Sequence, residues 1–155
     1  KVRFGLILRD PYNLFASRIR KWPQHFESDR DISDQVNLWL AHVKLVEQPR
    51  PVFGPDPVVP ILYNKLVVDP FYRDSLAESL NTLKGNAGLD DVPVYGHGSS
   101  FDGYETRGKT VQAGVFERWK SSLDDPRFRR VIADKRLQEA AERVFGIAPP
   151  RLSEL

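Results

Sequence analysis

The stretch from Val2 to Arg18, "VRFGLILRDPYNLFASR", constrains the fold more than any other part of the sequence. Its first half is a nearly continuous apolar run, as a strand buried on both faces of a parallel sheet requires. Asp10 predicts an N-cap, and Pro11 predicts the first residue of a helix over 11–22, since proline loses nothing there by lacking an N–H. A strand that runs directly into a helix predicts an α/β fold with an anion site at the junction.

The predicted helix over 11–22 has two different faces. The helical spacing turns one face toward a core, and that face holds Leu14, Phe15, Ile19 and Trp22. The opposite, polar face contains Asn13, Ser17 and Arg20, which are spaced at i, i+4 and i+7. The helix therefore offers hydrogen-bonding side chains on the face away from the core.

The composition limits the classes of function. The chain has 155 residues, 41% of them hydrophobic, which is enough for the core of a single domain over 1–155. A net charge of +2 is too small for a general nucleic-acid binder or a membrane-surface protein, so we expect no nucleic-acid partner. The sequence has no cysteine and no apolar run near the roughly 18 residues of a membrane span. We therefore expect a cytoplasmic protein without a membrane span.

The rest of the sequence predicts one further strand, several helices and two long connections. Ser33 is the expected N-cap of the second helix, Asp69-Pro70 opens the third, and Gly146 ends the last. The predicted segments are a helix to about Gln48, a proline-rich connection over 48–60, a strand over 58–64, a helix after Pro70, a glycine-rich loop over 85–103, and helices over 111–123 and 125–145. Two strands and about five helices leave a parallel sheet incomplete, so we expect further strands from a part of the protein before Lys1.

Four segments together resemble the C-terminal half of a family of enzymes. They are "LRDPYNLFASR" (8–18), "ILYNKLVVDPFYRDSLAESL" (61–80), "GHGSSFDG" (96–103) and "FERWKSSLDDPRF" (116–128). In this order they resemble the sulfotransferases that use 3′-phosphoadenosine 5′-phosphosulfate (PAPS). The resemblance implies a three-layer parallel sheet flanked by helices, of the P-loop type. The loop for the 5′-phosphosulfate and a catalytic His or Glu would then precede Lys1, so we expect residues 1–155 alone to transfer no sulfuryl group.

The resemblance also implies a reaction and a set of binding residues. The enzyme would transfer a sulfuryl group from PAPS to a hydroxyl or amine of a small-molecule, glycan or lipid acceptor and release adenosine 3′,5′-bisphosphate. Arg9 and Ser17 would hold the 3′-phosphate of the nucleotide. Ser17 lies about 9 Å along the helix axis, within reach of a phosphate that Arg9 also contacts. The other interpretation is a capped helix whose Arg9 is paired with a surface carboxylate.

A second group of candidate residues precedes the helix predicted over 111–123. Arg107 and Lys109 flank Gly108, and a glycine with consecutive N–H groups at a helix start suits an anion. These three residues resemble the basic glycine loop with which the family closes over the 3′-phosphate. A solvated loop without a ligand is the alternative interpretation.

The three histidines do not predict a metal centre. His25, His42 and His97 have no zinc-like spacing and no accompanying carboxylate cluster, so we expect no metal. His42 is expected in a core or an interface, and His97 is a candidate for contact with substrate. Two other functions remain open: a non-catalytic nucleotide-binding or interaction domain with half of this fold, and a fragment of a phosphoryl-transfer kinase.

Overall fold

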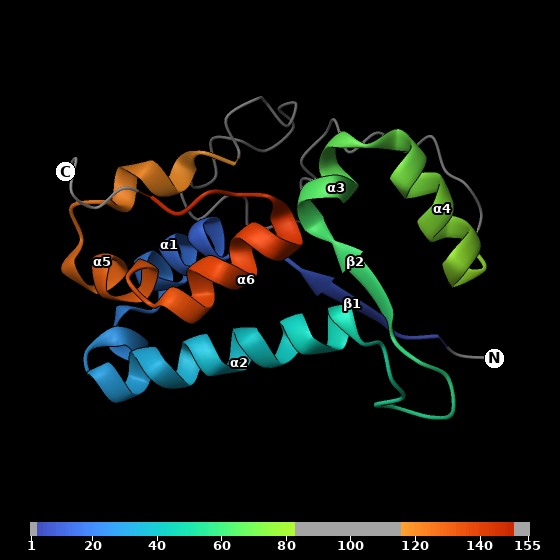
Figure 1. The fold of residues 1–155 in the computed structure, drawn as a ribbon, viewed down its shortest axis with the longest axis horizontal. Coiled ribbons are helices and arrows are strands. Elements are labelled where there is room, and N and C mark those ends of the chain that lie inside the picture. The colour runs from blue at the N-terminus through green and yellow to red at the C-terminus, as the bar shows by residue number, and fades with distance from the viewer. Residues whose placement is uncertain (1–2, 83–115, 151–155) are drawn as a thin grey trace.

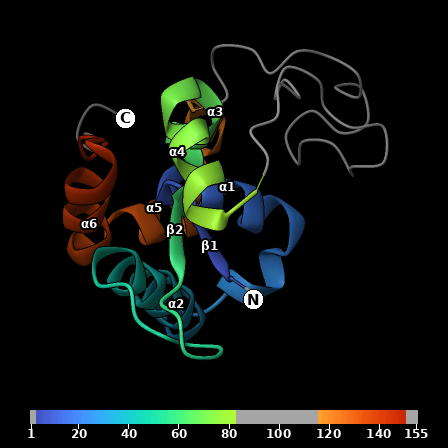
Figure 2. The ribbon, with the colours of Figure 1, turned by 90° about the vertical axis from the view of Figure 1, so that its right-hand side faces the viewer.

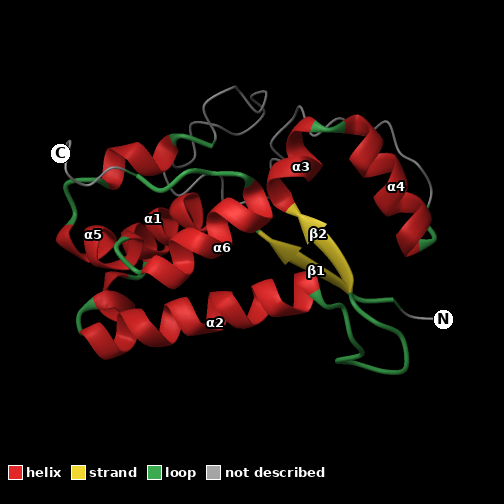
Figure 3. Cartoon of the chain, in the orientation of Figure 1, coloured by secondary structure: helices red, strands yellow, loops and turns green. Residues whose placement is uncertain are grey.

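The computed structural model describes residues 3–82 and 116–150, which form a mixed α/β structure (Figures 1 and 3). Strands β1 (Gly5–Leu8) and β2 (Val59–Leu62) pair in parallel, with Leu8 opposite Leu62. The helical elements are α1 (Pro11–Lys21), η1 (Pro23–Phe26), α2 (Asp29–Glu47), α3 (Tyr63–Val68), α4 (Pro70–Leu80), η3 (Arg118–Ser122), α5 (Pro126–Ile132) and α6 (Lys135–Phe145), of which η1 and η3 are 3-10 helices. The α/β class predicted from the sequence is confirmed. The described residues contain a sheet of two strands, not the expected three-layer sheet.

The hydrophobic core lies among α1, α2, α5 and α6. Its largest fully buried side chains include Trp39, Phe15, Phe26 and Phe128. Figures 1 and 2 show these helices gathered beside the strand pair, with α2 and α4 on opposite sides of it. Because residues of both β1 and α1 belong to this core, the core fixes the orientation of α1 relative to β1.

Strand β1 is not buried on both faces, contrary to the sequence prediction. Leu8 is buried, but the side chain of Ile7 is 61% exposed and Phe4 is also exposed. Helix α2 packs against the strand pair, but none of the described residues covers the side chain of Ile7. Gly5 faces β2 so closely that a Cβ there would lie 2.7 Å from Ile61 Cδ1.

The outer edge of β2 is closed by a side chain of α4. The Tyr72 hydroxyl accepts a hydrogen bond from the backbone N of Leu62 at 2.9 Å and donates one to the carbonyl of Pro60 at 3.4 Å. These backbone groups point away from β1 and would otherwise pair with a third strand. Within residues 3–82 and 116–150, β1 is therefore the edge at which another strand could be added.

Three predicted element boundaries are wrong, and capping side chains explain the two that concern α2 and α6. Helix α2 begins at Asp29, because Ser28 and Asp31 form a reciprocal capping box upstream of Ser33. The predicted helix over 125–145 is divided into α5 and α6, since the Asp134 side chain caps a new helix. The predicted strand over 58–64 ends at Leu62, where α3 begins.

The two faces of α1 are only partly as predicted. Phe15 and Ile19 are buried, which confirms the apolar face, but Trp22 is 44% exposed, and the Lys21 ammonium lies 4.7 Å from the centroid of its ring. Asn13 was expected on a polar surface and is instead buried. The polar face of α1 is thus covered in its first turn.

The predictions for 85–103 and for the start of the helix over 111–123 lie outside the described residues. In the described part of that helix, residues 118–122 form the 3-10 helix η3 rather than an α-helix. The proline-rich connection over 48–60 is confirmed as non-helical up to β2. Its Phe53 ring packs on Phe4, with 5.3 Å between ring centroids.

Candidate functional site

Four polar or aromatic residues lie close together where β1 and β2 end. Leu8 is opposite Leu62, and the residues that follow this pair are Arg9 and Asp10 after β1 and Tyr63 and Asn64 after β2. The Arg9 guanidinium carbon lies 5.2 Å from the centroid of the Tyr63 ring, and the backbone N of Asp10 donates to Asn64 Oδ1 at 3.3 Å. Sequence reasoning missed Tyr63 and Asn64; the signal available was that they are the last two residues of the second predicted strand, over 58–64.

Arg9 is held by its main chain and by the Tyr63 ring. Its carbonyl accepts a hydrogen bond from the Trp39 indole Nε1 at 3.1 Å, which ties the end of β1 to α2. Its side chain is half-buried. Within residues 3–82 and 116–150, the Arg9 guanidinium forms no ion pair with a carboxylate. The described residues therefore do not show the carboxylate partner that the alternative interpretation of Arg9 requires.

Asp10 is the N-cap of α1, as predicted, but it is also part of a buried network. The residue is 1% exposed. Its Oδ1 accepts from the backbone N of Asn13 at 2.9 Å and from Asn13 Nδ2 at 3.1 Å. The carboxylate that lies next to Arg9 in sequence is thus engaged by amide groups of α1.

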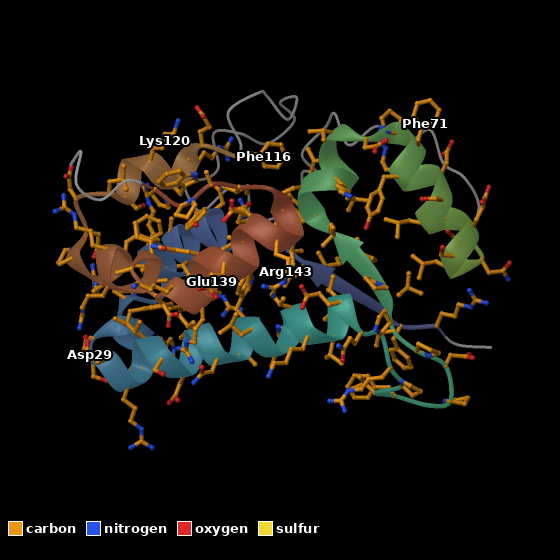
Figure 4. The ribbon with its side chains drawn as sticks, viewed as in Figure 1. Asp29, Phe71, Phe116, Lys120, Glu139 and Arg143 are labelled. Atoms are coloured by element: carbon orange, nitrogen blue, oxygen red, sulfur yellow. The ribbon has the colours of Figure 1, made fainter. Side chains whose placement is uncertain are left out.

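Asn13 extends this network to a distant part of the chain. Its Nδ2 also donates to the carbonyl of Phe116 at 2.7 Å, and its Oδ1 accepts from the backbone N of Trp119 at 3.2 Å. In Figure 4, Phe116 is seen between η3 and α3. The first turn of α1 is therefore fastened to the segment that leads into η3.

Tyr12, the second residue of α1, lies next to the junction of β1 and α1. It is fully buried, its ring centroid is 5.4 Å from that of Trp119, and its hydroxyl has no hydrogen-bond partner within the part of the chain that the structure describes. Burial, aided by the negative charges of Asp10 and Glu142, raises the pKa of Tyr12 to about 12. The phenol is therefore neutral at physiological pH.

Ser17 lies in the second turn of α1, half-buried, on the helix face shared by Asn13 and Arg20. Asn13 binds the start of the 116–122 segment. Arg20 lines an open hollow of about 400 Å³ whose other walls include Ser121, Ser122 and Arg127. Asn13 and Arg20, which share a helix face with Ser17, therefore both lie beside the 116–122 segment. The structure thus places Arg9 just before α1 and Ser17 along it.

The other predicted site residues divide into two groups. Arg107, Gly108, Lys109 and His97 lie outside the described residues. His25 is exposed and His42 is half-buried on α2. Across residues 3–82 and 116–150, no group of three metal-ligating side chains is found. No helix in these two ranges is both long enough and apolar enough to cross a membrane.

The chain matches no protein-family model, no curated protein and no solved structure. The resemblance to the PAPS-dependent sulfotransferases therefore rests on the quoted sequence segments.

Proposed function

We propose that this chain binds the 3′-phosphate of an adenosine nucleotide at the β1–α1 junction. The observation that carries the proposal is the Arg9 guanidinium, half-buried on the Tyr63 ring at the carboxyl end of two parallel strands. It has no carboxylate partner among the described residues. A guanidinium stacked on an aromatic face keeps its N–H groups available for bidentate contact with a phosphate.

Ser17 completes the proposed phosphate site. The hydroxyl of Ser17 lies on α1, whose amino terminus favours negative charge. Arg107, Gly108 and Lys109 would close over the same phosphate from the loop that precedes η3. The nucleotide is PAPS before the reaction and adenosine 3′,5′-bisphosphate after it.

The whole protein would be a cytoplasmic PAPS-dependent sulfotransferase with a P-loop-type three-layer sheet. Further strands of that sheet would join at the free edge of β1, since Tyr72 occupies the outer edge of β2. The acceptor is a hydroxyl or amine on a small molecule, glycan or lipid. In-line transfer of the sulfuryl group depends mainly on positioning and on neutralising charge, which is what a fixed guanidinium supplies.

The test compares adenosine 3′,5′-bisphosphate with AMP by titration calorimetry of the wild-type chain. We expect the bisphosphate to bind more tightly, and Arg9→Ala to remove most of that preference. Loss of a charged hydrogen bond to phosphate costs about 1.5–3 kcal/mol, or roughly 10- to 100-fold in affinity. Arg30→Ala is the matched control, since it removes one positive charge from an exposed position of α2. Equal affinity of the wild type for both nucleotides would overturn the proposal.

A non-catalytic nucleotide-binding domain is the second candidate function. The observation that favours it is that the described residues of this junction account for binding alone: they supply the Arg9 guanidinium, whereas the buried Asp10 carboxylate is engaged by Asn13 and is unsuited to act as a base. The base that transfer requires would precede Lys1. A radiolabelled PAPS assay of the whole protein, with glycan, phenol and lipid acceptors, distinguishes the two functions, since residues 1–155 alone are expected to transfer nothing. The enzyme transfers label to an acceptor, whereas the binding domain retains the preference for the bisphosphate and transfers nothing.

A further inference from the structure

We infer that Asn13 is a positioning residue that couples the proposed phosphate site to the segment Phe116–Ser122. The inference rests on the proposed function. It concerns a different property, namely that occupation of the Arg9 and Ser17 site and ordering of this segment depend on each other. It also assigns a role to the one α1 side chain that sequence reasoning placed on the wrong surface.

The geometry gives Asn13 two partners more than a hundred residues away. Its Nδ2 donates to the Phe116 carbonyl at 2.7 Å, and its Oδ1 accepts from the Trp119 backbone N at 3.2 Å. The residue is 1% exposed, so these bonds form where water does not compete with them. A side-chain amide supplies a donor and an acceptor at once, whereas a carboxylate supplies acceptors alone. The site therefore requires an amide.

The same network reaches the strand ends. Asn13 Nδ2 also donates to both carboxylate oxygens of Asp10, at 3.1 and 3.3 Å, and the backbone N of Asp10 donates to Asn64. The end of β1, the start of α3 and the segment before η3 thus share one chain of hydrogen bonds. A movement of Phe116 or Trp119 would therefore change the hydrogen bonds of Asn13 to Asp10, the residue next to Arg9.

Ser17 lies one helical turn beyond Asn13 on the same face. Two other residues of that face lie beside the 116–122 segment: Asn13 accepts from the Trp119 backbone N, and Arg20 lines a hollow together with Ser121. A ligand that prefers one arrangement of that face must stabilise the segment, and a fastened segment must favour the ligand by the same factor. Asn13 is the side chain through which this coupling runs.

The first experiment uses the wild-type chain and residue-resolved hydrogen exchange. The Trp119 backbone N–H donates to Asn13 Oδ1. We expect its hydrogen exchange to slow by about tenfold or more with saturating adenosine 3′,5′-bisphosphate and to change little with saturating AMP. Unchanged Trp119 exchange with bound bisphosphate overturns the inference and leaves the proposed function intact. This measurement needs no variant and stays decisive if Asn13 variants do not fold.

The second experiment compares Asn13→Ala with Asn37→Ala. Asn37 is an exposed amide on α2 that accepts a hydrogen bond from Arg136, so its variant controls for loss of an amide elsewhere. We expect the ratio of AMP to bisphosphate dissociation constants to fall about tenfold in Asn13→Ala and to stay within twofold in Asn37→Ala. Slow exchange of α2 amides in both variants verifies the fold. An unchanged ratio in folded Asn13→Ala overturns the inference, whereas absence of any bisphosphate preference in the wild type overturns the proposed function and this inference together.

Discussion

Among the described residues, three helices (α1, α4 and α5) begin with Asp-Pro, and α1 and α5 use this dipeptide differently. Asp10-Pro11 opens α1 and Asp125-Pro126 opens α5, and in both cases the aspartate caps the helix while proline takes its first position. At Asp125 the carboxylate pairs with Arg127, through Nε to Oδ1 at 3.0 Å and Nη2 to Oδ2 at 2.8 Å. At Asp10 the carboxylate instead receives the amide groups of Asn13.

The difference follows from where arginine stands relative to the cap. Arg127 follows the proline, so its guanidinium folds back onto the cap and the charges neutralise each other. Arg9 precedes the cap at the end of a strand, and its side chain lies against Tyr63 instead. The α5 opening thus neutralises its own arginine, whereas the Arg9 guanidinium of the α1 opening has no carboxylate partner among the described residues. The spacing of one arginine distinguishes the two uses of the motif.

The largest expected effect on stability comes from removing each cap in turn. Asp10→Ala removes the cap and leaves buried amide groups of Asn13 without their acceptor, so we expect a loss of about 3 kcal/mol in the free energy of unfolding. Asp125→Ala removes a partly exposed cap and ion pair, for which we expect about 1 kcal/mol. Urea unfolding at pH 7 measures both. Equal losses would show that the Asp10 network contributes no more than an ordinary cap.

The contribution of Asp125 is also expected to depend on pH. The hydrogen-bonded Arg127 guanidinium holds the pKa of Asp125 below its ordinary value of 3.8 in the folded protein. A lowered folded pKa means that the stabilisation is present above 3.8 and is lost as the pH falls through the folded pKa. We expect Asp125→Asn, which keeps a capping oxygen and loses only the ion pair, to be about 0.5 kcal/mol less stable than the wild type at pH 7.

Denaturant midpoints of both proteins at pH 7, 5 and 3 measure this effect. The difference in the free energy of unfolding between wild type and Asp125→Asn should remain constant from pH 7 to pH 5 and shrink below 3.8. A difference that persists unchanged in acid would mean that the pair with Arg127 is not its source.

Sequence reasoning succeeded where one local interaction decides the structure. The Asp10-Pro11 and Asp69-Pro70 openings and the Gly146 end were predicted because caps and left-handed C-termini depend on adjacent residues. The predicted N-cap at Ser33 is wrong, because the capping box of Ser28 and Asp31 starts α2 earlier in the sequence. Short-range rules therefore locate helix ends, provided that every nearby cap is weighed.

The parts of the site that sequence reasoning missed depend on contacts between distant segments. Asn13 has the spacing of a surface residue, and it is buried because Phe116 and Trp119 pack over it from more than a hundred residues away. Tyr63 meets Arg9 because β1 and β2 pair in a register that no local pattern specifies. The place of Arg9 between a strand and a capped helix could be predicted from the sequence, whereas its role as a phosphate ligand stays a prediction.

The smallest expected effect on stability is that of a substitution at Tyr12, the residue that follows Pro11. Tyr12 follows Pro11 where Arg127 follows Pro126, and its buried hydroxyl has no partner among the described residues. Because Tyr12→Phe removes a polar group that contributes no hydrogen bond, we expect its free energy of unfolding to stay within about 0.5 kcal/mol of the wild type at pH 7.

The sign of the change at high pH follows from the raised pKa of Tyr12. Burial holds the phenol neutral and raises its pKa from 10.0 to about 12, so the folded protein retains a proton that the unfolded chain releases above pH 10. The wild type should therefore lose stability relative to Tyr12→Phe as the pH rises from 10 toward 12. Urea unfolding of both proteins at pH 7, 10 and 11.5 measures the difference. A clear loss of stability in Tyr12→Phe at pH 7 would show that the hydroxyl is hydrogen-bonded in solution, and the α1 opening would then contain one more buried polar contact than the α5 opening.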